Sequence, residues 1–176
     1  MKKVKVATVW LDGCSGCHMS LLDMDAAIIS LARKIDLVYG PLVDAQEFPE
    51  DVDVTLVEGA VSSQDDLNKI QKIRQRTSVL ISLGDCAVSG NVPGMRNSIP
   101  VHRLLQRVYV EGAEESKVLP SDRVPALLKQ ARPLREFVQV DLCLPGCPPP
   151  AKAIFAVIND LLDGKKPDGT LKVKFG

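Results

Sequence analysis

The sequence predicts an α/β fold with a doubly wound, mostly parallel sheet. Short apolar runs alternate with longer segments of helical periodicity along the chain. The apolar runs are rich in valine, leucine and isoleucine on both faces, as parallel strands buried between two layers of helices require. Alternation of this kind is typical of doubly wound sheets. With 176 residues and 45% hydrophobic content, the chain can bury its own core, so we expect residues 1–176 to form a single domain.

Five apolar runs are the candidate strands of this sheet. They lie at residues 4–11, 36–43, 52–59, 78–85 and 136–144. Three further segments have the spacing of amphipathic helices and lie at residues 20–34, 62–75 and 149–164. Ser63 and Asp66 predict a capping box at the start of the second helix, and Gly164 follows the third helix as a stop. This succession predicts a flavodoxin-like strand order.

The segment from 100 to 135 has mixed local signals. We expect a short helix at 100–112, a surface loop at 113–122 and a second short helix at 123–131.

The charge balance excludes several classes of partner. The chain has 22 basic and 22 acidic residues and only 4% aromatic residues, which disfavours nucleic-acid binding and a basic membrane anchor. The start, "MKKVKVATVWL", lacks the features of a signal peptide, and no later stretch is long and apolar enough to span a bilayer. We therefore expect a cytoplasmic protein, in which five cysteines favour metal or redox chemistry over structural disulfides.

Four of the five cysteines follow predicted strands. Cys14 and Cys17 come after the first strand, Cys86 ends the fourth, and Cys147 follows the fifth. Ligands of open α/β sheets bind at the carboxyl ends of the strands. The sequence therefore predicts that these four thiols meet at the carboxyl edge of the sheet.

Three kinds of thiol site are compatible with the "CSGC" pair. A thioredoxin-type disulfide leaves Cys86 and Cys147 unexplained. A structural zinc site has the right number of ligands, although zinc sites tend to use a second close C-x-x-C pair. A 4Fe-4S cluster accepts four thiolates from distant loops, and this spacing favours it. The glycines and prolines in "DGCSGC", "LGDC" and "PGCPPP" also favour a cluster, because they let the backbone approach the ligands closely.

The fifth cysteine is not expected to be a ligand. If residues 136–144 are extended at about 3.3 Å per residue, Cys143 lies on the order of 10 Å from Cys147 along the strand. We expect Cys143 to be buried as a small apolar residue.

Three other polar residues lie near the predicted site. Glu58 ends the third strand, so its carboxylate is a candidate proton relay or metal ligand, or else a capping or interface group. Asp85 precedes Cys86 and is expected to form a turn. His18 follows Cys17 and is a candidate hydrogen-bond donor near the site or an interface residue.

Motifs for other chemistries are absent from the sequence. There is no P-loop, no G-x-G-x-x-G after a strand, no G-x-S-x-G and no evident Cys/His/Asp triad. A chain with one cluster and no substrate site is expected to transfer electrons to or from a redox centre in another subunit.

Four motifs together carry a family resemblance. They are "VWLDGCSGCHMSLLD", "VEGAVSS", "LGDCAVSGNVPGMRN" and "DLCLPGCPPPA". In this order and spacing they closely resemble the small subunit of bidirectional NAD-reducing [NiFe] hydrogenases, from the first strand to the closing "KFG". The chain is also similar to the cluster-bearing 20 kDa-type subunit of respiratory complex I, which has adjacent cysteines where this chain has "CSGC".

The resemblance implies a specific role for the thiols. Cys14, Cys17, Cys86 and Cys147 would hold the 4Fe-4S cluster proximal to a NiFe site in a separate large subunit. Electrons from hydrogen would continue to flavin and iron-sulfur diaphorase subunits that carry FMN and reduce NAD. Such a subunit belongs to a hydrogen:NAD+ oxidoreductase but has no catalytic residue of its own. Glu58 matches a family position near the cluster, which favours a proton relay or an alternative cluster ligand.

Two sequence features refine this expectation. The chain has neither the C-terminal extension with further ligands nor the twin-arginine leader of respiratory hydrogenases, so we expect one cluster and a cytoplasmic location. The loop "SGNVPGMRNS" follows Cys86 and is expected to expose Val92, Met95 and Arg96 for contact with the large subunit.

Overall fold

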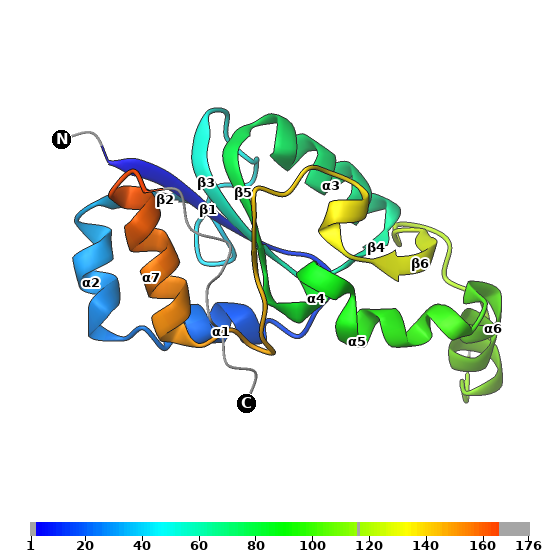
Figure 1. Cartoon of the computed structure of the whole chain (residues 1–176). Helices are drawn as coiled ribbons and strands as arrows, with labels where there is room; N and C mark the ends of the chain where they lie inside the picture. Colours follow the sequence, from blue (N-terminus) through cyan, green and yellow to red (C-terminus); the bar gives the residue numbers. More distant parts are fainter. Residues whose placement is uncertain (1–2, 116, 166–176) are drawn as a thin grey trace.

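A five-stranded parallel sheet forms the centre of the computed structural model, which describes residues 3–115 and 117–165 (Figure 1). Its strand order is β2-β1-β3-β5-β7, and all neighbouring strands are parallel. The strands are β1 (Val4–Trp10), β2 (Ile35–Tyr39), β3 (Val52–Glu58), β5 (Thr77–Leu83) and β7 (Leu142–Leu144). Numbered within this sheet alone, the order is 2-1-3-4-5, the flavodoxin-like order. The predicted fold class is confirmed.

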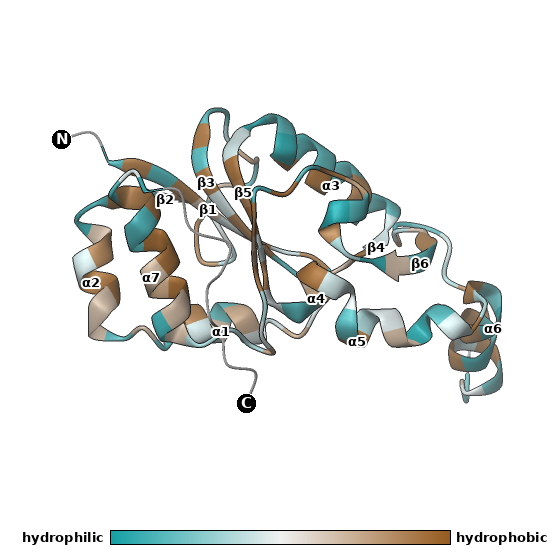
Figure 2. Cartoon of the chain, viewed as in Figure 1, coloured by the Kyte–Doolittle hydropathy of each residue, from teal (hydrophilic) through white to brown (hydrophobic). Residues whose placement is uncertain are grey.

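Helices cover both faces of this sheet. One face carries α1 (Gly16–Leu22), α2 (Ala26–Ala32) and α7 (Ala151–Leu162), and the other carries α3 (Gln64–Gln75) and α4 (Gly84–Ser89). Successive strand residues alternate between the two cores: Leu56 belongs to the cluster under α2 and α7, and Val57 to the cluster under α3. Figure 2 shows the corresponding hydrophobic colour along the strands and on α7. The sheet is therefore apolar on both faces, as its sequence predicted.

The start of α3 confirms the predicted capping box. The backbone N–H of Asp66 donates to Ser63 Oγ at 3.1 Å, and the backbone N–H of Ser63 donates to Asp66 Oδ2 at 2.9 Å. Two amides that the helix cannot satisfy itself are thus satisfied.

The helix predicted at 20–34 is two helices in the structure. The first, α1, begins earlier, at Gly16, and ends at Leu22; α2 begins at Ala26. Asp25 between them has a φ of 50° and donates its backbone N–H to Leu22 O, which closes a turn. Because α1 begins at Gly16, Cys17 lies in its first turn.

The prediction of a helix at 123–131 is wrong. Its second half is a strand, β6 (Leu127–Arg132), which pairs antiparallel with β4 (Val61–Ser63) in a separate two-stranded sheet. The side chain of Asn97 accepts from the backbone N–H of Ala131 at 2.8 Å and donates to its carbonyl at 2.7 Å, so it serves as a further strand-like partner. Pairing across the fold has overridden local helix propensity.

The remaining connections differ from the predictions mainly at their bounds. The helix at 100–112 is α6 (Val101–Gln106), which continues as a π-helical stretch at Arg107–Glu111 and lies at one end of the molecule. The described residues of 113–122 form no helix or strand, as expected of a loop. Of the strand predicted at 136–144, only Leu142–Leu144 is a strand in the structure, and a 3-10 turn at Leu134–Glu136 precedes it. The closing segment from residue 166, with its "KFG", lies outside the described residues.

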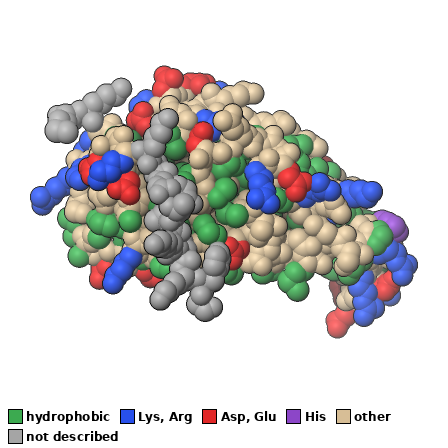
Figure 3. All heavy atoms as spheres, viewed as in Figure 1, with side chains coloured by type: hydrophobic (Ala, Val, Ile, Leu, Met, Phe, Trp, Pro, Cys, Tyr) green, Lys and Arg blue, Asp and Glu red, His purple; other side chains and the backbone are tan. Residues whose placement is uncertain are grey.

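Acidic and basic side chains are interspersed on the face drawn in Figure 3, in keeping with the balanced charge of the chain. Within residues 3–115 and 117–165, no helix has both the length and the apolar character needed to cross a bilayer.

Candidate metal centre

Four thiols line one cavity at the carboxyl edge of the main sheet. Cys14 precedes α1, Cys17 lies in its first turn, Cys86 lies in α4, and Cys147 lies between β7 and α7. The cavity has a volume of about 90 Å³, and Glu58 and Asp85 also line it. The structure therefore brings together the four cysteines and the glutamate that the sequence singled out.

The strand order explains why residues so far apart in sequence meet here. β1, β3, β5 and β7 are consecutive neighbours in the sheet, and each leads directly into a cavity-lining segment. The segments that follow β1 and β3 are also bonded to each other, since Asp12 and Ala60 exchange backbone hydrogen bonds of 3.1 and 2.8 Å.

Glycine lets the backbone approach the sulfur atoms. Gly84, at the start of α4, has a φ of 82°, and a Cβ added there would overlap Cys17 Sγ. A Cβ added at Gly16 would lie 3.3 Å from Cys14 Sγ, tighter than an ordinary contact. Side chains at these positions would occupy the space that the thiols now use.

Hydrogen bonds join the segments that carry the cysteines. Asp85 Oδ1 accepts from the backbone N–H of Gly146 at 2.8 Å, and the backbone N–H of Asp85 donates to Gly146 O at 2.9 Å. On the other side, Ser20 Oγ of α1 donates to Pro149 O, just after the cis Cys147–Pro148 bond. The Cys147 segment is thus bonded to both α4 and α1.

Burial and negative charge dominate the electrostatics of the inner thiols. Burial raises the pKa of the Cys17 thiol, and the neighbouring Glu58 carboxylate raises this pKa further. Burial also raises the pKa of Cys86, partly opposed by a hydrogen bond from the backbone N–H of Val92. A cationic metal core favours deprotonation, since coordinated thiols lose their protons outright.

Two polar side chains lie at the cavity: Asn91 lies beside a thiol, and Glu58 forms part of the cavity wall. The amide nitrogen of Asn91 lies 3.6 Å from Cys147 Sγ, in position to donate to the sulfur. Glu58 is only 3% exposed, and its Oε2 accepts from the backbone N–H of His18 at 3.1 Å. The His18 ring packs edge-on against Trp10, with ring centroids 6.1 Å apart.

Several predicted positions are corrected by the structure. Cys143 does not line the cavity, but the expectation of burial is wrong, because its side chain is exposed on the short edge strand β7. The turn expected at Asp85 is wrong, because Asp85 lies in the first turn of α4 and its side chain bonds to the distant Gly146. Gly84 is the glycine of "LGDC" and lies close to a thiol, as the sequence predicted for the glycines around the cysteines. Asn91 was not predicted as a site residue; its only sequence signal was its closeness to Cys86.

The segment predicted as a loop that contacts a partner is helical in the structure, with α5 (Asn91–Gly94) followed by a 3-10 helix at Met95–Ser98, and it is only partly exposed. Val92 and Met95 are 60% and 76% exposed. Arg96 is partly buried, so its expected exposure is wrong: Nη2 donates to Ser62 O at 3.0 Å and Leu128 O at 3.1 Å. These bonds connect the Met95–Ser98 segment to both strands, β4 and β6, of the two-stranded sheet. Partner contact by the three residues stays a prediction.

The structure defines a doubly wound α/β protein with four convergent thiols at the carboxyl edge of its sheet. The family model described as NADH ubiquinone oxidoreductase, 20 Kd subunit, matches residues 14–161, and the chain belongs to this family. The family resemblance seen in the sequence is therefore confirmed.

Hydrogenase subunits are among its relatives. The chain is 38% identical over 172 residues to a subunit of the F420-non-reducing hydrogenase vhu of Methanocaldococcus jannaschii, covering 97% of this chain and 60% of that protein. It is 39% identical over 168 residues to the NAD-reducing hydrogenase HoxS subunit delta of Cupriavidus necator, covering 93% of this chain and 80% of that protein. The chain thus spans less than two thirds of the length of the first relative.

A solved structure extends this similarity to the whole fold. The chain matches a chain in the crystal structure of an NAD+-reducing [NiFe]-hydrogenase in the H2-reduced state with a TM-score of 0.90 and 36% identity. The match covers 95% of both chains.

Proposed function

We propose that this chain is the electron-transfer small subunit of a cytoplasmic NAD-reducing [NiFe] hydrogenase. It would hold one 4Fe-4S cluster on Cys14, Cys17, Cys86 and Cys147, in a single domain over residues 1–176. Its partners would be a large subunit with the NiFe site and flavin/iron-sulfur diaphorase subunits with FMN and the NAD site.

The observation that carries this proposal is the set of four thiols around one cavity. Four thiols are the ligand number of a 4Fe-4S cluster and also of a structural zinc site. A zinc ion needs its thiolates at about 2.3 Å, whereas a cluster takes its thiolates on separate iron atoms. The close approach of the Gly84 backbone to Cys17 Sγ also supports a cluster site. A Cβ at Gly84 would overlap this sulfur, so only glycine lets the backbone lie so close to the proposed ligand.

The cluster, when bound, would supply one-electron transfer between a NiFe site and diaphorase subunits. The residues of this chain would set the conditions for that transfer. Half-buried Cys17 and Cys86 would shield the cavity from water on the inner side, while exposed Cys14 and Cys147 mark its open side. Hydrogen bonds to sulfur and nearby charge tune cluster potentials, so Asn91 and Glu58 are placed to adjust this one.

The two NAD-reducing relatives support the choice of enzyme. The similarity to HoxS subunit delta covers 80% of that protein, and the structural match covers 95% of the corresponding hydrogenase chain. The F420-non-reducing relative belongs to another kind of hydrogenase by its name, so hydrogen-dependent NAD reduction by the assembled complex is the activity to measure.

Metal analysis of protein purified without oxygen tests the site. We expect about four irons per chain, matching sulfide and broad visible absorption. Cys86→Ser should lose this iron, whereas Cys143→Ser should keep it, because Cys143 is exposed on β7 outside the cavity. The Cys143 variant thus controls for the loss of a thiol as such.

Two outcomes would contradict the cluster site, and a third would contradict the choice of enzyme. One zinc per chain in a colourless sample would instead indicate an interaction module held by zinc. Full iron content in Cys86→Ser would show that the ligand set is wrong. A complex that keeps its cluster but shows no hydrogen-dependent NAD reduction would leave the cluster assignment standing and refute the choice of enzyme.

A further inference from the structure

Glu58 lies in the wall of the thiol cavity with His18 on one side and Cys17 on the other. The Glu58 carboxylate is 3% exposed and ends β3 at the level of the cysteine segments. Cys17 belongs to the proposed ligand set, and it lines the same cavity as the Glu58 carboxylate. The orientation of this carboxylate therefore matters to whatever the thiols hold.

Both polar parts of His18 approach the carboxylate. The backbone N–H donates to Glu58 Oε2 at 3.1 Å. The ring atom Nδ1 lies 3.0 Å from Glu58 Oε1. The ring N–H is not aimed at this oxygen, so neither atom makes a hydrogen bond with good geometry within the described part of the chain.

The surroundings of the ring restrict it to this partner. His18 also lines a second, mostly apolar cavity of about 350 Å³, together with Trp10, Met19 and Leu22. The imidazole Nε2 is buried and has no hydrogen-bond partner among the described residues. Trp10 packs edge-on against the ring. Buried polar atoms are rarely left unpaired without a reason, and Glu58 Oε1 is the acceptor that lies 3.0 Å from Nδ1.

We propose that His18 is a positioning residue that holds the Glu58 carboxylate at the wall of the cluster cavity. The backbone N–H fixes one carboxylate oxygen, and the ring Nδ1, 3.0 Å from the other oxygen, is placed to fix it. This inference rests on the proposed function, since its consequence is a fixed negative charge beside the cluster. The competing explanation is that His18 only fills space between Trp10 and the cavity wall.

Two substitutions separate positioning from space filling. His18→Phe keeps a planar ring against Trp10 but removes Nδ1. His18→Asn is smaller but places an amide nitrogen where Nδ1 stood. His102→Phe is the matched control, because His102 is exposed on α6 and does not line the thiol cavity.

The readouts are iron content, the electron paramagnetic resonance spectrum and the midpoint potential of the cluster in the purified complex. Removing a carboxylate near the cluster should raise the potential, because negative charge disfavours the reduced state. We expect Glu58→Gln and His18→Phe to shift the potential upward, His18→Asn to restore it toward the wild-type value, and His102→Phe to leave it unchanged.

A double variant tests whether His18 acts through Glu58. If it does, His18→Phe adds no further shift in the Glu58→Gln background. An additive shift, or an unchanged spectrum and potential in His18→Phe, would overturn the positioning role. Loss of iron in both His18 variants would also overturn it and indicate a structural role. A wild-type protein without an iron-sulfur signal would instead refute the proposed function, and this inference with it.

Discussion

Asp85 and Gly146 exchange two hydrogen bonds across 61 positions of sequence. The Asp85 backbone N–H donates to Gly146 O at 2.9 Å, and Asp85 Oδ1 accepts from the Gly146 N–H at 2.8 Å. Each residue directly precedes a cysteine of the cavity, Cys86 or Cys147. The pair therefore sets the separation of two thiols that come from different strands.

Replacing Asp85 should loosen this connection. Asp85→Ala leaves the Gly146 N–H without its acceptor, at a cost of about 1–3 kcal/mol in the free energy of unfolding. Iron content should fall as well, because the Cys147 segment is no longer tied to α4. Asp85→Asn keeps an acceptor oxygen and should keep most of the iron. Metal analysis and denaturant unfolding check both effects, and equal iron in the alanine variant and the wild type would contradict this role.

Gly84 offers a steric test of the same site. Gly84→Ala adds a Cβ that overlaps Cys17 Sγ, so we expect loss of most of the bound iron. Gly164→Ala is the matched control: Gly164 also has a positive φ, of 70°, but an added Cβ meets nothing within 4 Å. Both variants should lose about 1 kcal/mol of stability through backbone strain. Similar iron contents in the two variants would show that the close approach at Gly84 is not needed.

The convergence of the cysteines could be predicted because it depends on chain order. Cys14, Cys86 and Cys147 each follow a strand, and a doubly wound sheet brings the carboxyl ends of its strands to one edge. The bonds that hold the site could not be predicted in this way. Nothing in the local sequence of Asp85 indicates Gly146 as its partner, and nothing around Arg96 indicates the carbonyls of the small sheet.

The elements of the fold also differ in how well the sequence alone predicts them. Long segments with clear periodicity, such as α3 and β3, were predicted close to their observed bounds. The strand β6 was predicted as a helix, because its "LLKQAR" has no strand alternation of its own. Its partner β4 has only three residues, which gives a single sequence too little pattern to reveal the pairing.

Asn91 should raise the potential of the cluster. Its amide donates toward Cys147 Sγ at 3.6 Å, and a hydrogen bond to a ligand sulfur stabilises the reduced state. Asn91 has a φ of 21°, so Asn91→Gly removes the donor while allowing the same backbone conformation. We expect a lower midpoint potential with unchanged iron content. A potential equal to that of the wild type would show that this bond has no effect on the sulfur.

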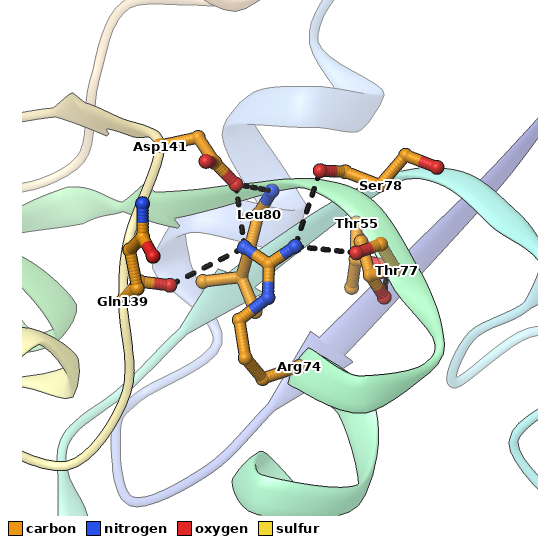
Figure 4. Close-up of polar contacts among 7 residues, drawn as sticks. All are labelled: Thr55, Arg74, Thr77, Ser78, Leu80, Gln139 and Asp141. Atoms are coloured by element: carbon orange, nitrogen blue, oxygen red, sulfur yellow. Dashed lines mark hydrogen bonds and ion pairs between the residues drawn. The ribbon is translucent and has the colours of Figure 1, made fainter.

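Arg74 should contribute to stability through its bonds at the start of β5 (Figure 4). Its guanidinium donates to the Asp141 carboxylate and to the carbonyls of Thr77, Ser78 and Gln139, while Asp141 Oδ2 also accepts from the Leu80 N–H. These bonds join α3, the start of β5 and the chain that leads into β7. Arg74→Met should cost about 2–3 kcal/mol in the free energy of unfolding.

Lys72 on the same helix provides the control for that measurement. Its ion pair with Glu47 lies at the surface, with side chains 42% and 81% exposed. Lys72→Met should therefore cost less than about 1 kcal/mol. Both variants should keep their iron, since neither residue lines the thiol cavity. Equal destabilisation by the two substitutions would mean that the Arg74 bonds are no stronger than a surface pair.

The 3-10 helix at Met95–Ser98 should contribute to assembly through the exposed side chain of Met95. Arg96→Glu would break the bonds to Ser62 and Leu128 and so disturb the fold itself, which makes it a poor test of a partner contact. Met95 is 76% exposed and can be changed without breaking internal side-chain bonds. Met95→Glu would place a charge in an apolar contact, and we expect copurification with a large subunit to weaken by about tenfold or more.

Ile29 is the matched control for this substitution. It is 65% exposed and lies on α2, at the opposite side of the sheet from α5 and the 3-10 helix that follows it (Figure 1). Ile29→Glu should keep copurification near the wild-type level, and both variants should retain their iron, because neither side chain lines the thiol cavity. A Met95 variant that copurifies as well as the wild type would exclude this side chain from the contact. A loss of assembly in the Ile29 variant alone would instead place the large subunit against α2.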